Sequence, residues 1–244
     1  MKLGLYFDLR NPGPWQRPYA HVYGRALELI ATAERLGAGS VWFTEHHLFD
    51  DGYLPQPLTM AAAVAARTEH TRIGTAVVLA PLRHPRHIAE EAAVVDILSG
   101  GRLELGFGAG YSMPEFSAFG AVWAERYART DATVTEVRRL LDESRVTPPP
   151  LQRPFPMWVG CQGPQGARRA GRLGAGLLSL RRELLEPYRA GLADGGHDPS
   201  AAHLAGLLDV VVADDPEEAR ERILPHYAHQ LNTYRRAAAG AQPS

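Results

Sequence analysis

The sequence has 244 residues, a formal net charge of −1 and 45% hydrophobic residues, enough for one large core. The near-neutral charge argues against a nucleic-acid or membrane-surface partner, and no apolar run reaches the ~18 residues that a bilayer-spanning helix needs. The single cysteine, Cys161, excludes an intramolecular disulfide and fits a reducing compartment. We therefore expect one cytoplasmic domain over residues 1–244.

Strand-like and helical segments alternate along the chain. The expected strands lie at 2–9, 40–47, 72–81, 102–110, 157–160, 176–180 and 207–213. The expected helices lie at 21–36, 58–69, 86–99, 124–144, 163–174, 185–194 and 216–238. Periodicity places Leu36 and Leu98 in the buried stripes of the first and third of these, and the last should begin with Asp215 as its N-cap and proline at the first helical position. Alternation of this kind predicts an α/β fold with a parallel sheet. Unusual residues at the carboxyl ends of several strands favour a TIM-like (β/α) barrel, and with seven clear strands we expect it to be shortened or incomplete at its C-terminal end.

The strand at 40–47 ends in Glu45-His46-His47, a carboxylate and two imidazoles at the rim of the expected barrel. Imidazole titrates near neutral pH and is a common general acid or base. Because side chains alternate along a strand, at most one of the two histidines faces the mouth. The other interpretation is that one histidine caps a loop and the other packs beneath it.

A metal-dependent hydrolase is a more distant hypothesis. His84 and His87 could join Glu45 as ligands, since histidine and carboxylate groups at strand ends bind zinc. Pro85 lies between the two histidines, however, and the second lies just inside a helix. A histidine that caps the start of this helix is the simpler interpretation.

Two glycine-rich segments follow strands. Gly106 to Gly110 lets the backbone approach a planar ring or an anion, although a tight turn explains it equally well. Gly160 to Gly166 precedes a helix, so its free N–H groups predict a phosphate site that Arg168 and Arg169 could assist. Cys161 in this loop has no obvious histidine partner, and we expect it to be inert.

Together these motifs resemble the bacterial luciferase-like flavin-dependent monooxygenases over nearly the whole chain. No single segment is decisive, but their order and spacing are specific. The matching segments are 33–37, 41–47, 73–76, 81–85, 89–92, 98–106, 110–111, 115–116 and 156–160.

The resemblance implies a barrel that binds reduced flavin mononucleotide (FMN), or in sister groups a deazaflavin, at its carboxyl face. It assigns His46 as the catalytic acid or base near the flavin and places a non-proline cis peptide between Ala76 and Val77. The implied cofactor-binding residues are Glu45, Ala76, Val77, Gly108, Ala109, Gly110, Gly160, Cys161, Gln162, Gly163 and Pro164. Many members carry an arginine where this chain has Ala109, so phosphate binding here would be weaker or would use Arg168 or Arg169.

The implied function is a two-component monooxygenase in which a separate reductase supplies reduced FMN and O2 oxidises a small lipid-like, aromatic or polyketide substrate. Tyr6, Tyr53 and Tyr111 are candidate substrate-facing residues. The resemblance also implies a homodimer formed through the helices after the second and third strands. The alternatives are a deazaflavin-dependent reductase on the same fold, or a truncated flavin-binding protein without catalysis.

Overall fold

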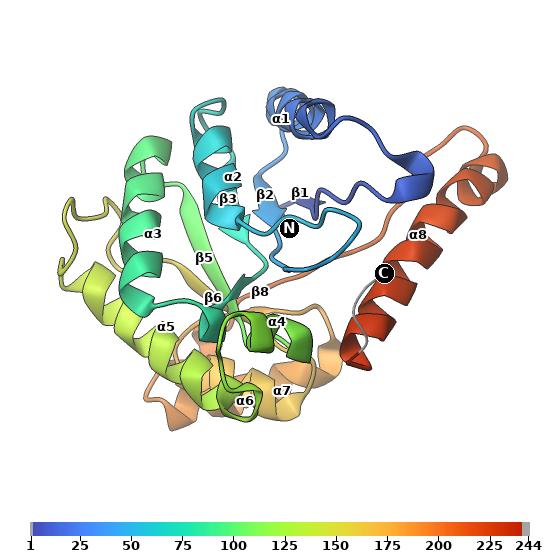
Figure 1. The fold of residues 1–244 in the computed structure, drawn as a ribbon. Helices are drawn as coiled ribbons and strands as arrows, with labels where there is room; N and C mark the ends of the chain where they lie inside the picture. Colours follow the sequence, from blue (N-terminus) through green and yellow to red (C-terminus); the bar gives the residue numbers. More distant parts are fainter. Residues whose placement is uncertain (1, 241–244) are drawn as a thin grey trace.

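The computed structural model describes residues 2–240, and its centre is a parallel sheet (Figure 1). The strands are β1 (Gly4–Phe7), β2 (Ser40–Phe43), β3 (Arg72–Thr75), β4 (Val78–Leu79), β5 (Leu103–Gly108), β6 (Met157–Gly160), β7 (Gly176–Leu178) and β8 (Leu204–Ala205). They pair in the order β1-β2-β3-β5-β6-β7-β8, and β4 also pairs with β5. Neighbouring strands are all parallel. The carboxyl ends of the strands therefore lie along one rim, which is where α/β enzymes place their sites.

The helices wrap around the outside of this sheet (Figure 1). They are α1 (Tyr19–Arg35), α2 (Pro57–Ala65), α3 (Pro85–Ser99), α4 (Met113–Ala118), α5 (Arg126–Asp142), α6 (Pro164–Arg172), α7 (Leu185–Asp194) and α8 (Pro216–Ala238). In the described part of the chain β8 does not pair with β1, so the sheet forms a half-barrel and the expectation of an incomplete TIM-like barrel is confirmed. Helix α8 covers the open side between α1 and α7. None of the described helices is both long and apolar enough to cross a bilayer.

The core lies between the sheet and its helices, because each parallel strand buries both faces. Among the fully buried side chains are Phe43 of β2, Ile73 of β3 and Phe107 of β5. Helices contribute small or branched residues at positions that repeat every three to four residues, which packs them closely on the sheet. In α3 these are Ile88, Ala89, Ala92, Ala93 and Val95.

Three sequence expectations about the periphery are wrong. The segment 207–213 is not a strand: the pairing residues are Leu204 and Ala205, and the chain then turns outward, with Val212 92% exposed. The last strand stops early because β7, its partner, is only three residues long. Leu36 and Leu98, expected in the buried stripes of their helices, are exposed because both lie at or beyond the last helical turn.

Two local predictions are confirmed. The expected strand 72–81 is interrupted between β3 and β4 by a cis peptide at Ala76-Val77. Helix α8 begins as its sequence predicts, since the Asp215 side chain accepts hydrogen bonds from the N–H groups of Glu217 and Glu218 and a proline follows at the first helical position.

Two helical glycines should respond in opposite ways to substitution by alanine. A Cβ at Gly171 in α6 would lie 2.3 Å from the Tyr188 carbonyl oxygen in α7, whereas a Cβ at Gly24 in α1 would meet nothing within 4 Å. We expect Gly171→Ala to lower the free energy of unfolding by about 1–3 kcal/mol through overpacking. Gly24→Ala should raise it by roughly 0.5–1 kcal/mol because alanine has the higher helix propensity. Urea unfolding measures both, and equal shifts in one direction would contradict the α6–α7 packing.

Candidate functional site

His46 lies just beyond β2 in the barrel mouth and is held through both ring nitrogens. Its Nδ1 is 2.9 Å from Oε1 of Glu115 in α4, and its Nε2 is 3.1 Å from the hydroxyl of Tyr111. The ring stacks on Phe49 at 4.6 Å between centroids, and His46 is only 6% exposed. The side chain that sequence analysis assigned to catalysis is therefore buried and fixed in orientation.

Glu115 determines which nitrogen of His46 carries the proton. The backbone N–H of His47 donates to the same Glu115 Oε1 at 2.6 Å, so this oxygen is an acceptor. An ionised carboxylate only accepts, so His46 Nδ1 donates to it and Nε2 of the neutral ring becomes the acceptor. The Tyr111 hydroxyl then donates to Nε2. This arrangement gives an oriented base whose reactive nitrogen faces the tyrosine.

Glu45 and His47 face away from this group. His47 Nε2 is 2.9 Å from Glu45 Oε1, and the other oxygen of Glu45 accepts from the Leu79 backbone N–H at 2.9 Å. The Arg83 guanidinium also binds Glu45, at 2.9 Å. The sequence expectation that at most one histidine faces the mouth is confirmed. Glu45 fastens β2 to the end of β4, and its expected contact with a cofactor stays a prediction.

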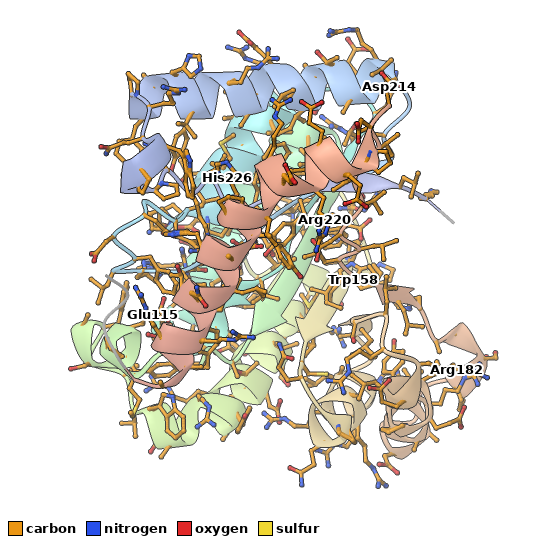
Figure 2. All side chains as sticks on the ribbon, turned by 90° about the vertical axis from the view of Figure 1, so that its right-hand side faces the viewer. Glu115, Trp158, Arg182, Asp214, Arg220 and His226 are labelled. Carbon is orange, nitrogen blue, oxygen red and sulfur yellow. The ribbon has the colours of Figure 1, made fainter. Side chains whose placement is uncertain are left out.

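The remaining wall of the mouth consists of tyrosines, one of them supplied by α8, which crosses in front of the sheet in Figure 2. The hydroxyls of Tyr53 and Tyr234 lie 2.9 Å apart. The Arg10 guanidinium lies over both rings, at 4.5 and 4.7 Å from their centroids. The His46 ring is 4.9 Å from Tyr53 and 6.0 Å from Tyr234. Sequence analysis missed Arg10 and Tyr234, because nothing in the spacing of the chain indicates that its last helix returns to the first strand.

Burial raises the pKa of the tyrosines in this cluster. It is the main cause of the raised pKa of Tyr6, Tyr53 and Tyr111, and the neighbouring Tyr234 raises each of them further. These hydroxyls therefore remain protonated hydrogen-bond donors at neutral pH. Arg10 remains charged, because Asp51, Tyr234 and Asp8 raise its pKa more than burial lowers it.

The glycine-rich end of β5 has a packing role that can be stated from the structure. A Cβ at Gly108 would lie 2.3 Å from Val77 Cγ2, and one at Gly160 of β6 would lie 2.9 Å from Val77 Cγ1. Glycine at both positions makes room for the side chain that follows the cis peptide. Gly110 turns the chain with φ of 69°, next to Ala109. Whether these positions also contact a cofactor stays a prediction.

The loop Gly160–Pro164 meets the N-terminus of α6, as expected. No side chain caps this helix, and the space next to its N-cap residue, Gly163, is open, since a Cβ there would meet nothing within 4 Å. The first N–H groups of α6 are thus available to an anion. Burial raises the pKa of the Cys161 thiol, which agrees with its expected inertness. These features fit a phosphate group.

The arginine nearest this loop is one that sequence analysis missed. Arg168 pairs with Asp194 at 2.6 Å and Arg169 with Asp131 at 2.8 Å, so both are held by neighbouring helices. Arg181, which follows β7, also has an acidic partner, Glu183 at 2.6 Å, but in addition it donates from Nη1 to the Gln162 carbonyl oxygen of this loop at 2.9 Å. The rule that function gathers at the carboxyl ends of strands would have indicated it.

His84 caps the start of α3, since its Nδ1 accepts from the Arg86 backbone N–H at 3.2 Å. The interpretation of His84 as a helix-start residue is confirmed. Among the described residues no group of three His, Cys, Asp or Glu side chains is arranged to hold a metal ion.

The fold of this half-barrel is shared with a known protein family. A model of the luciferase-like monooxygenases matches residues 1–244, and this chain belongs to that family.

Two kinds of relative are found among similar proteins. The monooxygenase RslO1 from Streptomyces bottropensis has the same fold, with a TM-score of 0.87 and 30% identity over 98% of this chain and 80% of that one. An F420-dependent glucose-6-phosphate dehydrogenase from Beutenbergia cavernae is 33% identical over 80% of this chain and 65% of that protein. The oxygenase component of a flavin-dependent trigonelline monooxygenase from Acinetobacter baylyi is 30% identical over 67% of this chain. The chain spans half of that oxygenase component and 65% of the dehydrogenase.

The buried tyrosines should resist ionisation. Because the pKa of Tyr6, Tyr53 and Tyr111 is raised above the ordinary value of about 10, the folded state retains their protons longer than the unfolded chain. These tyrosines then leave stability unchanged below pH ~10 and reduce it progressively above that value. In an alkaline titration we expect part of the tyrosinate absorbance to appear only as circular dichroism shows unfolding. Ionisation of all nine tyrosines in one early step would contradict the cluster.

Proposed function

We propose that this chain is the oxygenase component of a two-component monooxygenase that uses reduced FMN. The observation that carries the proposal is the Glu115–His46–Tyr111 series, in which both ring nitrogens of the buried His46 are bonded. The family, and its relative named as a flavin-dependent oxygenase component, support it. The proposal includes a separate reductase, O2 and a small organic substrate. The homodimer stays a prediction, which light scattering tests. Helix α3, one of the two helices expected at the dimer interface, exposes the apolar side chains of Val94, Ile97 and Leu98.

The residues at the rim fit the cofactor. The uncapped N-terminus of α6 and Arg181 would hold the flavin phosphate, and the strand ends at Ala76-Val77 and Gly108–Gly110 would lie beside the ring. Bound reduced flavin would supply the electrons that reduce one atom of O2 to water while the other atom enters the substrate. Arg181 would supply the positive charge that many members of the family supply with an arginine at the position of Ala109.

The chain's own contribution is proton handling and exclusion of water. Glu115 keeps the His46 proton on Nδ1, so Nε2 can take up the Tyr111 hydroxyl proton while that hydroxyl accepts a proton from the reacting group, and the same transfers in reverse return it. Tyr53 and Tyr234, joined through their hydroxyls, form another wall of the mouth, and His46 has almost no contact with solvent. A dry site protects a reactive intermediate from hydrolysis.

A deazaflavin-dependent reductase is the second candidate. The relative from Beutenbergia cavernae is F420-dependent by name. A carboxylate-oriented imidazole serves equally well to move a proton when hydride is exchanged with an alcohol or carbonyl carbon, and this chemistry needs no O2. The choice between the two functions therefore depends on the cofactor.

Anaerobic titration with reduced FMN and with reduced deazaflavin, followed by mixing with O2, tests the proposal. We expect reduced FMN to bind and a transient absorbance to form with O2. His46→Ala should bind FMN with nearly unchanged affinity but lower turnover about 10²-fold or more, as loss of a general acid–base predicts.

The other outcomes assign the other functions. Binding of deazaflavin alone would move the function to a reductase, and FMN binding without a transient would favour the truncated, non-catalytic protein. Full turnover by His46→Ala would remove this residue from the mechanism.

Substitution of Arg181 tests the phosphate end separately. We expect Arg181→Ala to weaken FMN binding about tenfold, since it removes one charge-assisted contact with the phosphate. Riboflavin, which has no phosphate, should bind the variant and the parent protein equally. Arg168→Ala is the matched control, because Arg168 lies on the adjacent helix and has an acidic partner at 2.6 Å, as Arg181 has, but its side chain makes no hydrogen bond to the Gly160–Pro164 loop within residues 2–240. Equal losses in both variants would argue against a specific role for Arg181.

A further inference from the structure

A cavity lined by Arg83, His84 and Arg129 lies near the Glu45-His46-His47 motif, apart from the tyrosine cluster. Its volume is about 240 Å³, and its lining comes from the β4–α3 connection, the α4–α5 connection and the first turns of α5. Arg83 lines the cavity and binds Glu45, and Glu45 binds His47. The His47 ring lies 4.5 Å from the ring of Phe119, which is part of the cavity wall. None of its lining residues belongs to the Gly160–Pro164 loop or to the tyrosine cluster. The cavity is thus separate from the proposed flavin site.

Helix α5 supplies the polar side chains that have no partner. Arg129 lines the cavity and is exposed, with no ion pair or hydrogen bond to another described residue. Thr133 lies one turn later on the same face, is only 7% exposed, and its hydroxyl likewise has no hydrogen-bond partner within residues 2–240. This hydroxyl and this cation are therefore two donors at one cavity that are free to bind a ligand.

The start of helix α3 adds one further donor to the cavity lining. His84 and Pro85 line the cavity at the first turn of this 15-residue helix, where the helix dipole is positive. His84 Nδ1 accepts from the backbone, so the proton of the neutral ring lies on Nε2, which can donate to a ligand. The residues that line the cavity include no Asp or Glu; Glu45 and Glu91 lie behind it, each paired with Arg83.

We propose that this cavity binds a small organic phosphate monoester. Arg129, the Thr133 hydroxyl and the Nε2–H of His84 bind the phosphate, because each donates a hydrogen bond and arginine adds a positive charge. Phe119, Pro81 and Leu82 form an apolar wall for the organic group. The site does not depend on the identity of the flavin.

Isothermal titration with phenyl phosphate and with inorganic phosphate tests this site. We expect both to bind, phenyl phosphate more tightly because its ring can pack on Phe119. Arg129→Ala should weaken binding about tenfold or more, as loss of one charge-assisted hydrogen bond predicts. Thr133→Val should weaken it severalfold and preserves the shape of the side chain. Both changes leave the core intact, and circular dichroism verifies the fold of each variant.

Two control variants locate the binding. Arg139→Ala removes the same charge from α5 at a residue paired with Glu136 and Glu143, and it should leave the affinity unchanged. Arg181→Ala should leave the Arg129-dependent binding unchanged, since Arg181 belongs to the proposed flavin loop, where phosphate binding would be lost instead. Loss of binding in Arg181→Ala alone would assign the phosphate to that loop, and absence of binding to the parent protein or full binding by Arg129→Ala would overturn the proposal.

Discussion

The site depends on one buried carboxylate. Glu115 is fully buried, and its Oε1 accepts both the backbone N–H of His47 and the ring proton of His46. Its Oε2 is buried without a partner among the described residues, so these two donors are the hydrogen bonds that hold the carboxylate, and with it α4, against the end of β2. Any movement of α4 would leave the carboxylate unpaired and would release His46 from its rotamer. The hydrogen bonds of Glu115 therefore both position the base and hold the elements of the mouth together.

A second buried ion group joins the two ends of the chain. Arg10, just after β1, binds Asp8 and Asp51, and α8 approaches the same carboxylates through His229 and Gln230. Tyr234 then covers the Arg10 guanidinium. In a complete barrel a strand would lie at this side of the sheet; here a helix supplies both the covering surface and a side chain of the site.

The features that could be predicted from the sequence are those that residues close together in the chain determine. Apolar strands with special carboxyl ends, the Asp215 cap of α8 and the uncapped start of α6 depend on neighbouring residues, and the family resemblance placed the Ala76-Val77 cis peptide. The roles of Glu115, Arg181 and Tyr234 depend on residues that meet across tens to hundreds of positions, and no spacing rule encodes such meetings. The segment 207–213 is apolar and strand-like, but a strand also needs a partner of matching length, which β7 does not offer.

The order of the sheet also bears on how the chain assembles. Along the main path each strand pairs with a neighbour that is close in sequence, whereas a closed barrel must join its first strand to its last. Pairing of this kind keeps contact order low and allows the half-barrel to grow in the direction of synthesis. Docking of α8 is the exception, since Gln230 and Asp8 are separated by 222 positions. We therefore expect the mouth to be the last part of the molecule to form, after the sheet that supports it.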